Sequence, residues 1–432
     1  MAKNKAEREK FIAVYADWMP GNEPFKLGTL WPIAARGNET FAFEFDAAAL
    51  NRPELCAYQL DPHLQLYAGR QFCPQGLANF GLFLDSSPDR WGRMLMKRRL
   101  DRQKRNGLVA PDKRLVESDY LLGVHDEFRV GALRFSLNDE GDFLDNNHNQ
   151  AAPPFVQLRA LEEASLSLER NPDDDSARVD DWLRMLISPG GSLGGARPKA
   201  SVVDPDGHLW IAKFPSTRDT RNMAAWELVA ITLAEACGIN VPEARVDQFS
   251  SDHHTFLVRR FDRTDEGERL HFASAMTLTG HKDGDDESTG VSYLELAQVL
   301  IQHGADTNDD LRELWTRIVF NMYVSNTDDH LRNHGFLLDP ARGWRLSPAY
   351  DINPIPDGGA GLKLNVNQDS NDLDIELALS VAPVFRLTTE KAQAIADHVK
   401  EVTSQWRTAA QALGVPQREI NDMGYAFRLA GA

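Results

Sequence analysis

The segment that most restricts the fold of this 432-residue chain is Asn326-Thr-Asp-Asp-His-Leu-Arg-Asn333. It follows directly on a run of apolar residues at helical spacing, which predicts one buried helix face: Leu311, Leu314, Trp315, Ile318, Val319, Met322 and Tyr323. A buried helix must therefore end in a polar loop that presents Asp328 and Asn333 with four residues between them. The alternative is an ordinary polar turn with a capping aspartate.

Asp328 and Asn333 have the Asp-x-x-x-x-Asn spacing of a phosphotransferase loop. In that chemistry the aspartate accepts or orients the proton of the attacking hydroxyl, and the asparagine oxygen binds a Mg²⁺ that neutralises phosphate charge. His330 lies between them, where its ring is placed to brace the loop. Asp351, in a turn bracketed by prolines, is the candidate for a second metal-ligating carboxylate, although aspartates in loops more often cap turns or helices.

A β-hairpin is predicted upstream, because two apolar runs flank a stretch of turn-forming residues. Strands are expected at 200–203 and 208–214, and a helix is expected at about 221–237, ended by Gly238. A glycine-rich loop at 190–195 precedes the hairpin. Glycines let a backbone approach a ligand and aim its N–H groups at an anion, but such a loop is as often a surface turn.

Lys213 shares a strand face with Leu209 and Ile211, where the alternation predicts an inward apolar residue. A half-buried lysine needs an anion, and Glu227 on the following helix is its candidate partner. The alternative is a lysine on an edge strand that faces solvent. In their order along the chain, the loop, the lysine, the glutamate, the Asp-x-x-x-x-Asn segment and the later aspartate follow the plan of a phosphotransferase.

The pattern along the whole chain predicts an α+β fold with a mixed α/β N-terminal lobe and a mostly α-helical C-terminal lobe. We expect a strand-rich subdomain at 1–150, a small lobe with the hairpin at 151–265 and an all-helical catalytic lobe at 266–432. Further strands are predicted at 41–45, 64–67 and 131–136, and further helices at 89–105, 155–169, 179–187 and 389–413.

The net charge limits the partners of the chain, because 47 Lys and Arg stand against 64 Asp and Glu, a balance of −17. An acidic protein is repelled by phosphates, which argues against a bare nucleic-acid binder. Residues 90–114 are the exception, with ten Lys or Arg against Asp101 and Asp112. They are either a solvated helix face or a surface for DNA phosphates or an acidic protein.

The cysteine count and the apolar runs indicate the compartment. Three cysteines form no Cys-x-x-Cys pair, which argues against a secreted disulfide framework and against a cysteine zinc site. The first residues have no long apolar core, and no run approaches the ~18 apolar residues of a membrane helix. We expect a cytoplasmic protein without a membrane partner.

Several motifs together resemble the HipA family, the serine/threonine kinase toxins of bacterial HipBA-type toxin–antitoxin systems. The motifs fall in family order over nearly the whole chain: Phe80-Gly-Leu-Phe-Leu-Asp-Ser-Ser-Pro-Asp-Arg-Trp-Gly92, Gly131-Ala-Leu-Arg-Phe135, Ser192-Leu-Gly-Gly-Ala-Arg-Pro-Lys199, Ile211-Ala-Lys-Phe-Pro215, Arg260-Phe-Asp-Arg263, Thr327-Asp-Asp-His-Leu-Arg-Asn333 and Pro348-Ala-Tyr-Asp351. Two segments depart from the family pattern, 271–278 and an acidic loop at 280–289, and both lie where substrate or nucleotide contacts would be tuned.

The resemblance implies a HipA-like, two-lobed, protein-kinase-like fold and a role for each matching residue. Asp328 would be the catalytic base with His330 beside the nucleotide, Asn333 and Asp351 would ligate Mg²⁺, and Ser192 would be autophosphorylated as an inactivating switch. ATP would be held by a larger set: Gly194, Gly195, Ala196, Arg197, Lys199, Lys213, Glu227, the hinge backbone from Arg259 to Phe261, and Tyr350.

The resemblance also implies partners. These are a protein substrate such as an aminoacyl-tRNA synthetase or another translation factor, and a HipB-like helix-turn-helix antitoxin. DNA would be reached mainly through the antitoxin, aided by residues 90–114, and the biological outcome would be persistence. Two other interpretations stay open: a small-molecule phosphotransferase of related fold, and a non-catalytic corepressor or scaffold with a kinase fold.

Overall fold

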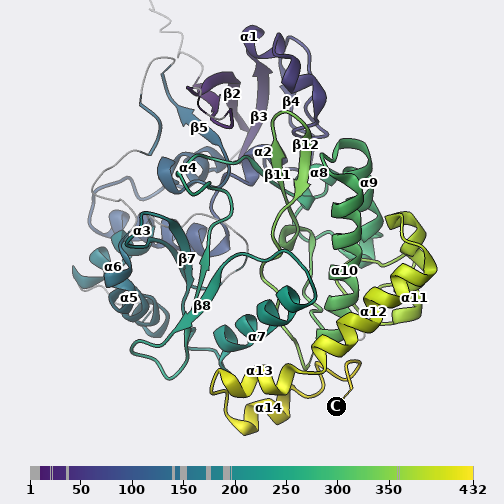
Figure 1. Cartoon of the computed structure of the whole chain (residues 1–432). Helices are drawn as coiled ribbons and strands as arrows, with labels where there is room; N and C mark the ends of the chain where they lie inside the picture. The colour runs from purple at the N-terminus through teal and green to yellow at the C-terminus, as the bar shows by residue number, and fades with distance from the viewer. Residues whose placement is uncertain are drawn as a thin grey trace, which may run out of the picture.

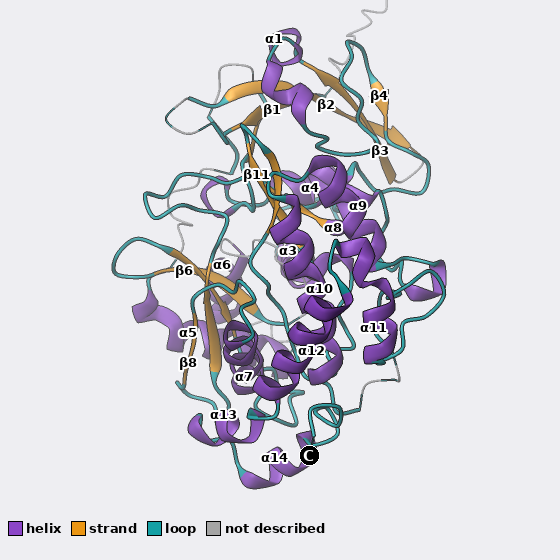
Figure 2. Cartoon of the chain, turned by 45° about the vertical axis from the view of Figure 1, so that its right-hand side comes forward, coloured by secondary structure: helices purple, strands orange, loops and turns teal. Residues whose placement is uncertain are grey.

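The computed structural model describes residues 10–19, 21, 23–35, 38–138, 142–145, 153–171, 177–187, 195, 197–357, 359 and 361–431. Within these ranges the chain forms three antiparallel sheets with helices packed around them (Figures 1 and 2). The predicted α+β class is confirmed. The N-terminal part mixes strands with helices, and helices dominate the C-terminal part.

The first sheet has five strands in the order β4-β3-β2-β1-β5 and lies at the top of Figure 1. Its strands are β1 (Ile12–Ala16), β2 (Phe25–Ala35), β3 (Asn38–Phe45), β4 (Gln71–Phe72) and β5 (Leu133–Ser136). The strand predicted at 64–67 is wrong. Leu64 is buried, whereas Leu66 and Tyr67 are exposed, and the Leu64 N–H donates to the Asp61 carbonyl, so this segment is a turn.

Six helices surround this sheet and the next one: α1 (Ala47–Leu50), α2 (Gly81–Leu84), α3 (Arg90–Arg105), α4 (Glu117–Leu122), α5 (Leu158–Arg170) and α6 (Ala177–Ile187). The basic helix α3 begins at Asp89, whose Oδ1 accepts from the Gly92 N–H at 2.8 Å. Such a cap satisfies a donor that the helix itself cannot pair, and it anchors the start of the helix.

The second sheet has the order β6-β7-β9-β8, with strands β6 (Lys199–Val203), β7 (Leu209–Lys213), β8 (Ala244–Asp247) and β9 (Thr255–Arg259). Helix α7 (Met223–Ala236) packs against β8 and β9. Because β7 is paired on both sides, Lys213 is on an interior strand, and the edge-strand alternative for this lysine is wrong.

The C-terminal part is mostly helical, but the expectation of an all-helical region at 266–432 is wrong. It contains a three-stranded sheet of β10 (Phe272–Ser274), β11 (Gly335–Asp339) and β12 (Gly343–Leu346). Its helices are α8 (Ala275–Thr279), α9 (Tyr293–His303), α10 (Thr307–Val324), α11 (Ile375–Val381), α12 (Thr389–Thr403), α13 (Trp406–Ala412) and α14 (Gln417–Met423). Helix α10 buries the apolar face that the sequence predicts. The domain boundaries at 150 and 265 stay predictions.

The single helix predicted at 389–413 is broken between Thr403 and Trp406. The break has a packing reason, since α12 lies on α10 whereas α13 turns away to lie on α7. Residues 406–431, which we call the C-terminal brace, then cover one end of α7 (Figure 1).

The C-terminal brace contacts both halves of the molecule. The Glu419 carboxylate accepts from the Asn222 N–H at 3.1 Å and from Trp226 Nε1 at 2.9 Å, at the start of α7. The Ala426 carbonyl accepts from Ser325 Oγ at 2.6 Å, just after α10. The brace therefore ties the start of α7 to the loop that follows α10.

No helix within the described residues is long and apolar enough to cross a membrane.

Candidate active site

Lys213 lies at the end of β7, between two carboxylates. Its Nζ is 2.6 Å from Glu227 Oε1 on α7 and 2.9 Å from Asp351 Oδ1 in the segment after β12. The Lys213 and Glu227 side chains are only 10% and 6% exposed, and that of Asp351 is 25% exposed. We call these three residues the site cluster, which joins the small sheet, α7 and the helical part at one point.

The cluster carries one positive charge between two acids. Burial alone lowers the pKa of Lys213, but the charges of Asp351 and Glu227 outweigh it and hold this pKa above its usual value. Burial raises the pKa of Asp351, yet the Lys213 charge and hydrogen bond lower it to about 2. Burial also raises the pKa of Glu227, with Lys213 opposing. A lysine that stays protonated beside an ionised aspartate suits the binding of phosphate and metal.

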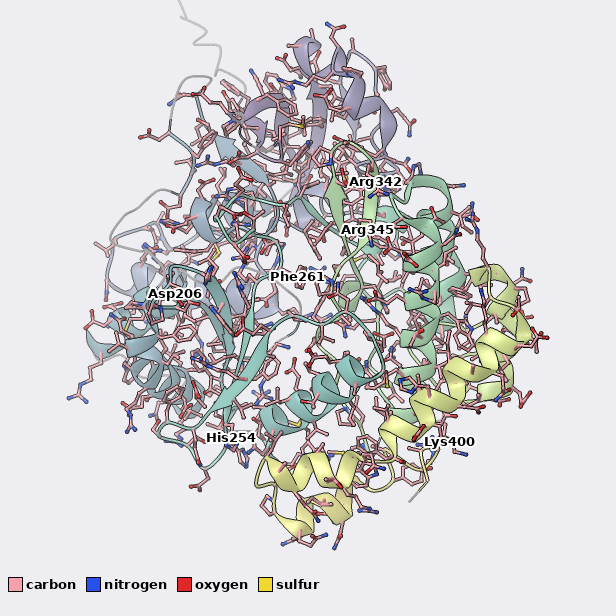
Figure 3. The ribbon with its side chains drawn as sticks, in the orientation of Figure 1. Asp206, His254, Phe261, Arg342, Arg345 and Lys400 are labelled. Carbon is pink, nitrogen blue, oxygen red and sulfur yellow. The ribbon has the colours of Figure 1, made fainter. Side chains whose placement is uncertain are left out.

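The site cluster forms one end of a narrow pocket under the small sheet. Apolar residues line the rest: Ile211 of β7, Ile231 of α7, Phe256 and Val258 of β9, and Pro242, Phe261 and Tyr350 of connecting segments. The Phe261 and Tyr350 rings lie 5.5 Å apart, and Figure 3 places Phe261 in the middle of the molecule. The pocket encloses about 20 Å³, so these side chains must separate to admit a planar base.

The Asp-x-x-x-x-Asn loop follows α10. Asp328 is exposed, and its backbone carbonyl accepts from the His330 N–H at 2.9 Å and from Asn333 Nδ2 at 3.1 Å. These two bonds curl the loop so that Asp328 stands at its outer end. Asn333 is buried, and within the described residues its Oδ1 has no hydrogen-bond partner.

Asp329 is the residue of this loop that sequence reasoning missed. It is buried, and its Oδ2 accepts from Tyr293 OH at 2.6 Å, from Asn321 Nδ2 at 2.8 Å and from His334 Nε2 at 2.8 Å. Burial raises its pKa, but His334 and Tyr293 outweigh burial and lower it. The available sequence signal was the aspartate doublet directly after a buried helix, where the second acid lies closest to the start of the Asp-x-x-x-x-Asn segment.

Asp328 and His330 face a wide groove of about 760 Å³ rather than the narrow pocket. The N-terminal part lines one wall of this groove with the segment from Pro88 to Arg93, and the acidic loop lines the other with residues 282–286. Asp283 of that loop is 3.1 Å from Arg90 and 4.0 Å from Arg332. The acidic loop that departs from the family pattern therefore borders the candidate acceptor site.

The predicted phosphate-contacting residues are only partly described. Ser192, Gly194 and Ala196 lie outside the described residues, and Gly195 lines the groove beside Asp328. Arg197 is bound to Asp219 through both guanidinium nitrogens, and buried Lys199 is 2.8 Å from Asp89. Both cations already have carboxylate partners, so they would have to exchange them to bind phosphate.

Arg259 ends β9, where its N–H donates to the Glu243 carbonyl at 2.8 Å, and its guanidinium is 2.5 Å from Asp265. Its side chain thus points away from the site cluster, toward an exposed acid. The segment from Arg259 to Phe261 can contribute to the pocket through its backbone and through the Phe261 ring.

Asn333 and Asp351 offer the oxygen atoms that Mg²⁺ prefers. Asn333 and the two neighbours of Asp351 line one small cavity, and the Asn333 Oδ1 atom is buried without a hydrogen-bond partner within the described residues. A buried amide oxygen without a donor costs free energy unless a ligand completes it. The residues present therefore fit a magnesium ion.

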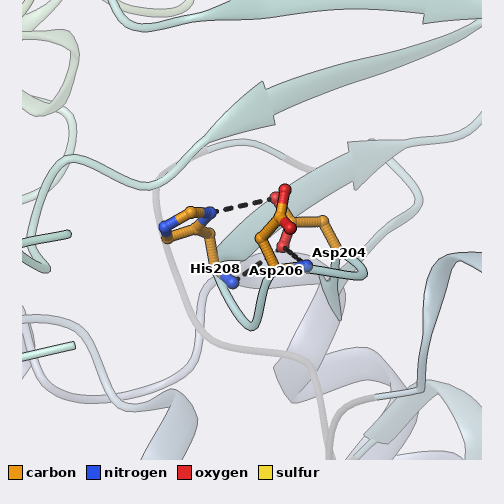
Figure 4. Close-up of side chains that lie close together, drawn as sticks. All are labelled: Asp204, Asp206 and His208. Carbon is orange, nitrogen blue, oxygen red and sulfur yellow. Dashed lines mark hydrogen bonds and ion pairs between the residues drawn. The ribbon is translucent and has the colours of Figure 1, made fainter. Parts of the chain in front are cut away.

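A second acidic cluster lies at the β6–β7 turn, where ligand atoms of Asp204, Asp206 and His208 lie within 4.8 Å of one another (Figure 4). Hydrogen bonds explain it fully as a turn. Asp204 accepts from the N–H groups of Asp206 and His208 at 2.9 and 2.8 Å and from Trp210 Nε1 at 2.8 Å. The turn stands at the opposite end of β7 from Lys213, at least about 16 Å away along the strand at strand spacing.

The basic stretch 90–114 is less basic in space than along the chain, because acids of other segments lie on it. Arg93 binds Glu117 through two 2.8 Å bonds, Arg102 binds Asp180, and Arg98 donates to the Leu168 carbonyl. A further contact is the Lys113–Asp119 pair at 3.1 Å.

Comparison with known proteins places these observations in a family. Residues 191–406, half of the chain, match the model of the HipA-like C-terminal domain. A Haemophilus influenzae protein named "Putative kinase" is 28% identical over 188 residues, which cover 39% of this chain and 54% of that protein. "Putative kinase Y4dM" of Sinorhizobium fredii is 29% identical over 206 residues, covering 42% and 48%. The chain spans about half the length of these curated relatives.

A solved structure extends the similarity to the whole fold. HipA of Shewanella oneidensis MR-1, in complex with HipB and its operator DNA, has a TM-score of 0.61 and 17% identity, over 97% of this chain and 95% of that one. The predicted two-lobed, kinase-like architecture is thereby confirmed as a fold.

Proposed function

Because the chain belongs to the HipA family, whose C-terminal domain matches half of it, we propose that it is an ATP-dependent serine/threonine protein kinase of the HipA type. The observation that carries the proposal is Lys213, held between Glu227 and Asp351 at 2.6 and 2.9 Å. A buried lysine on an interior strand that pairs with a helix glutamate is the arrangement that positions phosphates in kinases.

Each residue of the site then has a chemical task. Lys213 holds ATP phosphates, Asp328 accepts the proton of the acceptor hydroxyl at the edge of the groove, and the apolar pocket takes the base. Asn333 and Asp351 would hold Mg²⁺, which supplies charge neutralisation for the transferred phosphoryl group. The exposure of Asp328 suits a base that must meet a side chain of another protein.

We further propose that Ser192 is the autophosphorylation site and that its phosphate silences the enzyme. A phosphate adds about −1.5 to −2 charges to a loop beside the ATP phosphates, and the repulsion expels that loop. Gly195, three residues later, is described and lines the same groove as Asp328, which supports the proposal.

The proposed partners follow the Shewanella HipA complex, which contains HipB and operator DNA. We propose a HipB-like antitoxin and a role as the toxin of such a module, with persistence as the outcome and a translation factor as the class of substrate. DNA would be reached through the antitoxin, aided by exposed residues of the stretch 90–114. Buried free thiols at Cys73 and Cys237 suit a reducing cytoplasm.

The test is incubation of the purified chain with γ-labelled ATP and Mg²⁺. We expect label on Ser192, no label in Asp328→Ala, and full labelling in Asp369→Ala, a matched change of an exposed loop acid. Turnover with small alcohols alone would support the small-molecule phosphotransferase. An Asp328→Ala protein that keeps its full biological effect would support the scaffold.

A further inference from the structure

A chain of side-chain amides connects the catalytic loop to the metal-binding aspartate. Asn321 Nδ2 donates to Asp329 at 2.8 Å, and Asn326 Nδ2 donates to Asn321 Oδ1 at 3.1 Å. The Asn353 N–H donates to Asn326 Oδ1 at 3.3 Å, and Asn353 Nδ2 donates to Asp351 Oδ1 at 3.3 Å. We call Asn321, Asn326 and Asn353 the amide chain. Its members come from α10, from the loop after α10 and from the segment after β12.

The amide chain is fixed by burial. Asn321, Asn326 and Asp329 are 3%, 1% and 4% exposed, so each polar atom that loses its partner there stays unpaired. Asn326 is the central member, because it uses its donor toward the catalytic loop and its acceptor toward the Asp351 segment.

Two residues with left-handed backbone lie next to the amide chain. Among the described non-glycine residues, only Ser325, Asp351 and Arg386 have positive φ. Ser325, at φ 51°, directly precedes Asn326, and Asp351, at φ 58°, is held by Asn353. Left-handed backbone at such residues persists only where surrounding contacts enforce it. The amide chain supplies contacts next to both positions.

We propose that Asn326 is a positioning residue that fixes Asp351 relative to Asn333, and that it thereby sets the affinity for the metal–nucleotide pair. The inference rests on the proposed function. Asn326 touches neither nucleotide nor metal. Asn326 acts on the Asp351 carboxylate through Asn353. It acts on the loop that carries Asn333 through Asn321 and Asp329.

The variant Asn326→Asp separates this role from simple packing. It keeps the shape and the oxygen that accepts from the Asn353 N–H, but it puts an acceptor oxygen opposite Asn321 Oδ1, where a donor now lies at 3.1 Å. One link breaks and the other stays. Asn421→Asp is the matched control, because the same change on exposed α14 keeps the oxygen that accepts from Gln417.

The experiment is calorimetric titration of the full chain with ADP, with and without Mg²⁺, together with thermal unfolding of the free protein. We expect Asn326→Asp to weaken ADP binding about tenfold in Mg²⁺. We expect less than a twofold change without Mg²⁺ and no change in the Asn421→Asp control.

Three outcomes overturn the inference, and they differ from failure of the proposed function. Equal ADP affinity of Asn326→Asp and wild type in Mg²⁺ removes the positioning role. Equal weakening with and without Mg²⁺ assigns Asn326 to the base pocket instead. Wild type that binds no Mg·ADP overturns the proposed function and the inference with it.

If Asn326→Asp does not fold, Asn353→Ala provides the test. Asn353 is only half-buried, and this variant removes the bond to Asp351 while keeping the backbone donor to Asn326. We expect a threefold or greater loss of Mg·ADP affinity, and an unchanged affinity would overturn the inference.

Discussion

Two buried clusters of charged side chains differ in whether the polar atoms in and beside them all have hydrogen-bond partners. The site cluster holds one lysine between Glu227 and Asp351. The other, which we call the hinge cluster, surrounds Asp262 just beyond β9. Asp262 accepts from Arg260 at 2.6 Å, from Arg263 at 2.9 Å and from the Gly131 N–H at 2.9 Å.

The hinge cluster is closed. Its arginines also donate to backbone carbonyls of residues 127–129, so the N-terminal part is held directly behind the end of β9. Burial raises the pKa of Asp262, but Arg260 and Arg263 outweigh it and hold the pKa far below its usual value. Burial, which Asp262 opposes, lowers the pKa of Arg263 to about 9.

The site cluster is open by contrast. Its one lysine is shared between two carboxylates, and the nearby Asn333 Oδ1 lacks a donor within the described residues. Buried charged groups whose hydrogen bonds are made link neighbouring segments, whereas a buried acceptor without a donor is suited to a ligand. The difference between the clusters therefore separates a fastening from a binding site.

The largest expected effect is on activity at the open cluster. Asp351→Asn should lower kcat at least about 10³-fold, because one metal-binding charge is lost. Its free energy of unfolding should stay within about 1 kcal/mol of wild type, since Lys213 keeps Glu227 as a partner. Steady-state kinetics and urea unfolding measure the two quantities. The control is Asp357→Asn, a change of an 84% exposed acid. If Asp351→Asn lowered the free energy of unfolding as much as the hinge-cluster variant Asp262→Asn, the two clusters would not differ.

The closed cluster should show the reverse. Asp262→Asn leaves two buried arginines without their carboxylate and should cost about 3–5 kcal/mol of unfolding free energy. Asp265→Asn removes a 78% exposed partner of Arg259 nearby and should cost less than about 1 kcal/mol. If urea unfolding gives the two variants similar midpoints, the hinge cluster is not a fastening.

A smaller effect is expected at His271, a buried histidine outside both clusters. It stacks on Trp18 at 4.6 Å, and neither ring nitrogen has a partner within the described residues. Burial lowers its pKa from 6.5 to about 3. Below pH 6.5 the unfolded chain therefore binds a proton on this ring, whereas the folded chain does not. As the pH falls from 6.5 to 3, the free energy of unfolding decreases by up to about 1.4 kcal/mol per pH unit.

His271→Phe should flatten the pH dependence of unfolding in that window, whereas His398→Phe on the exposed face of α12 should leave it unchanged. Denaturant unfolding at pH 5.0, 6.0 and 7.5 measures the slope. An identical slope in wild type and His271→Phe would show that this histidine is not protonated on unfolding.

The smallest effect is expected at the exposed Arg90–Asp283 pair across the groove, whose side chains are 72% and 53% exposed. Arg90→Ala should change the free energy of unfolding by less than about 0.5 kcal/mol, and 0.5 M salt should remove even that. Thermal unfolding at two salt concentrations checks it. A loss above 2 kcal/mol would mean that exposed pairs hold this molecule as strongly as buried ones.

Local patterns predicted most of the elements. The alternation around Lys213 and the spacing after Leu311 indicated β7 and α10 within a few residues. The strand predicted at 64–67 was wrong, because alternation of apolar and polar residues does not distinguish a strand from this turn, which a hydrogen bond to the Asp61 carbonyl closes. The break after Thr403 was missed, because it depends on which helix each half packs against.

The sequence predicted only those parts of the candidate site whose contacts are local or follow a repeating pattern. Lys213 and Glu227 are fourteen residues apart on successive elements, and the structure brings them together at 2.6 Å. The ion pair of Lys199 with Asp89 joins residues 110 positions apart, and no pattern in either segment predicts it. The hydrogen bonds of Asp329 come from Tyr293 on α9, Asn321 on α10 and His334 just before β11, and local patterns do not predict that these three meet. The roles proposed for the site residues stay predictions.

The C-terminal brace has a consequence for the order in which the protein is made. Lys213, Glu227 and Asp328 all leave the ribosome before residues 406–431, which tie the start of α7 to the loop after α10. At about 5–20 residues per second, the 214 residues from Lys213 to Phe427 take roughly 10–40 s to synthesise. Throughout that interval the nascent chain lacks the contacts that hold α7 against the loop. A chain built in this way is completed last where its two halves meet, so the activity proposed for it would begin only after residues 406–431 are in place.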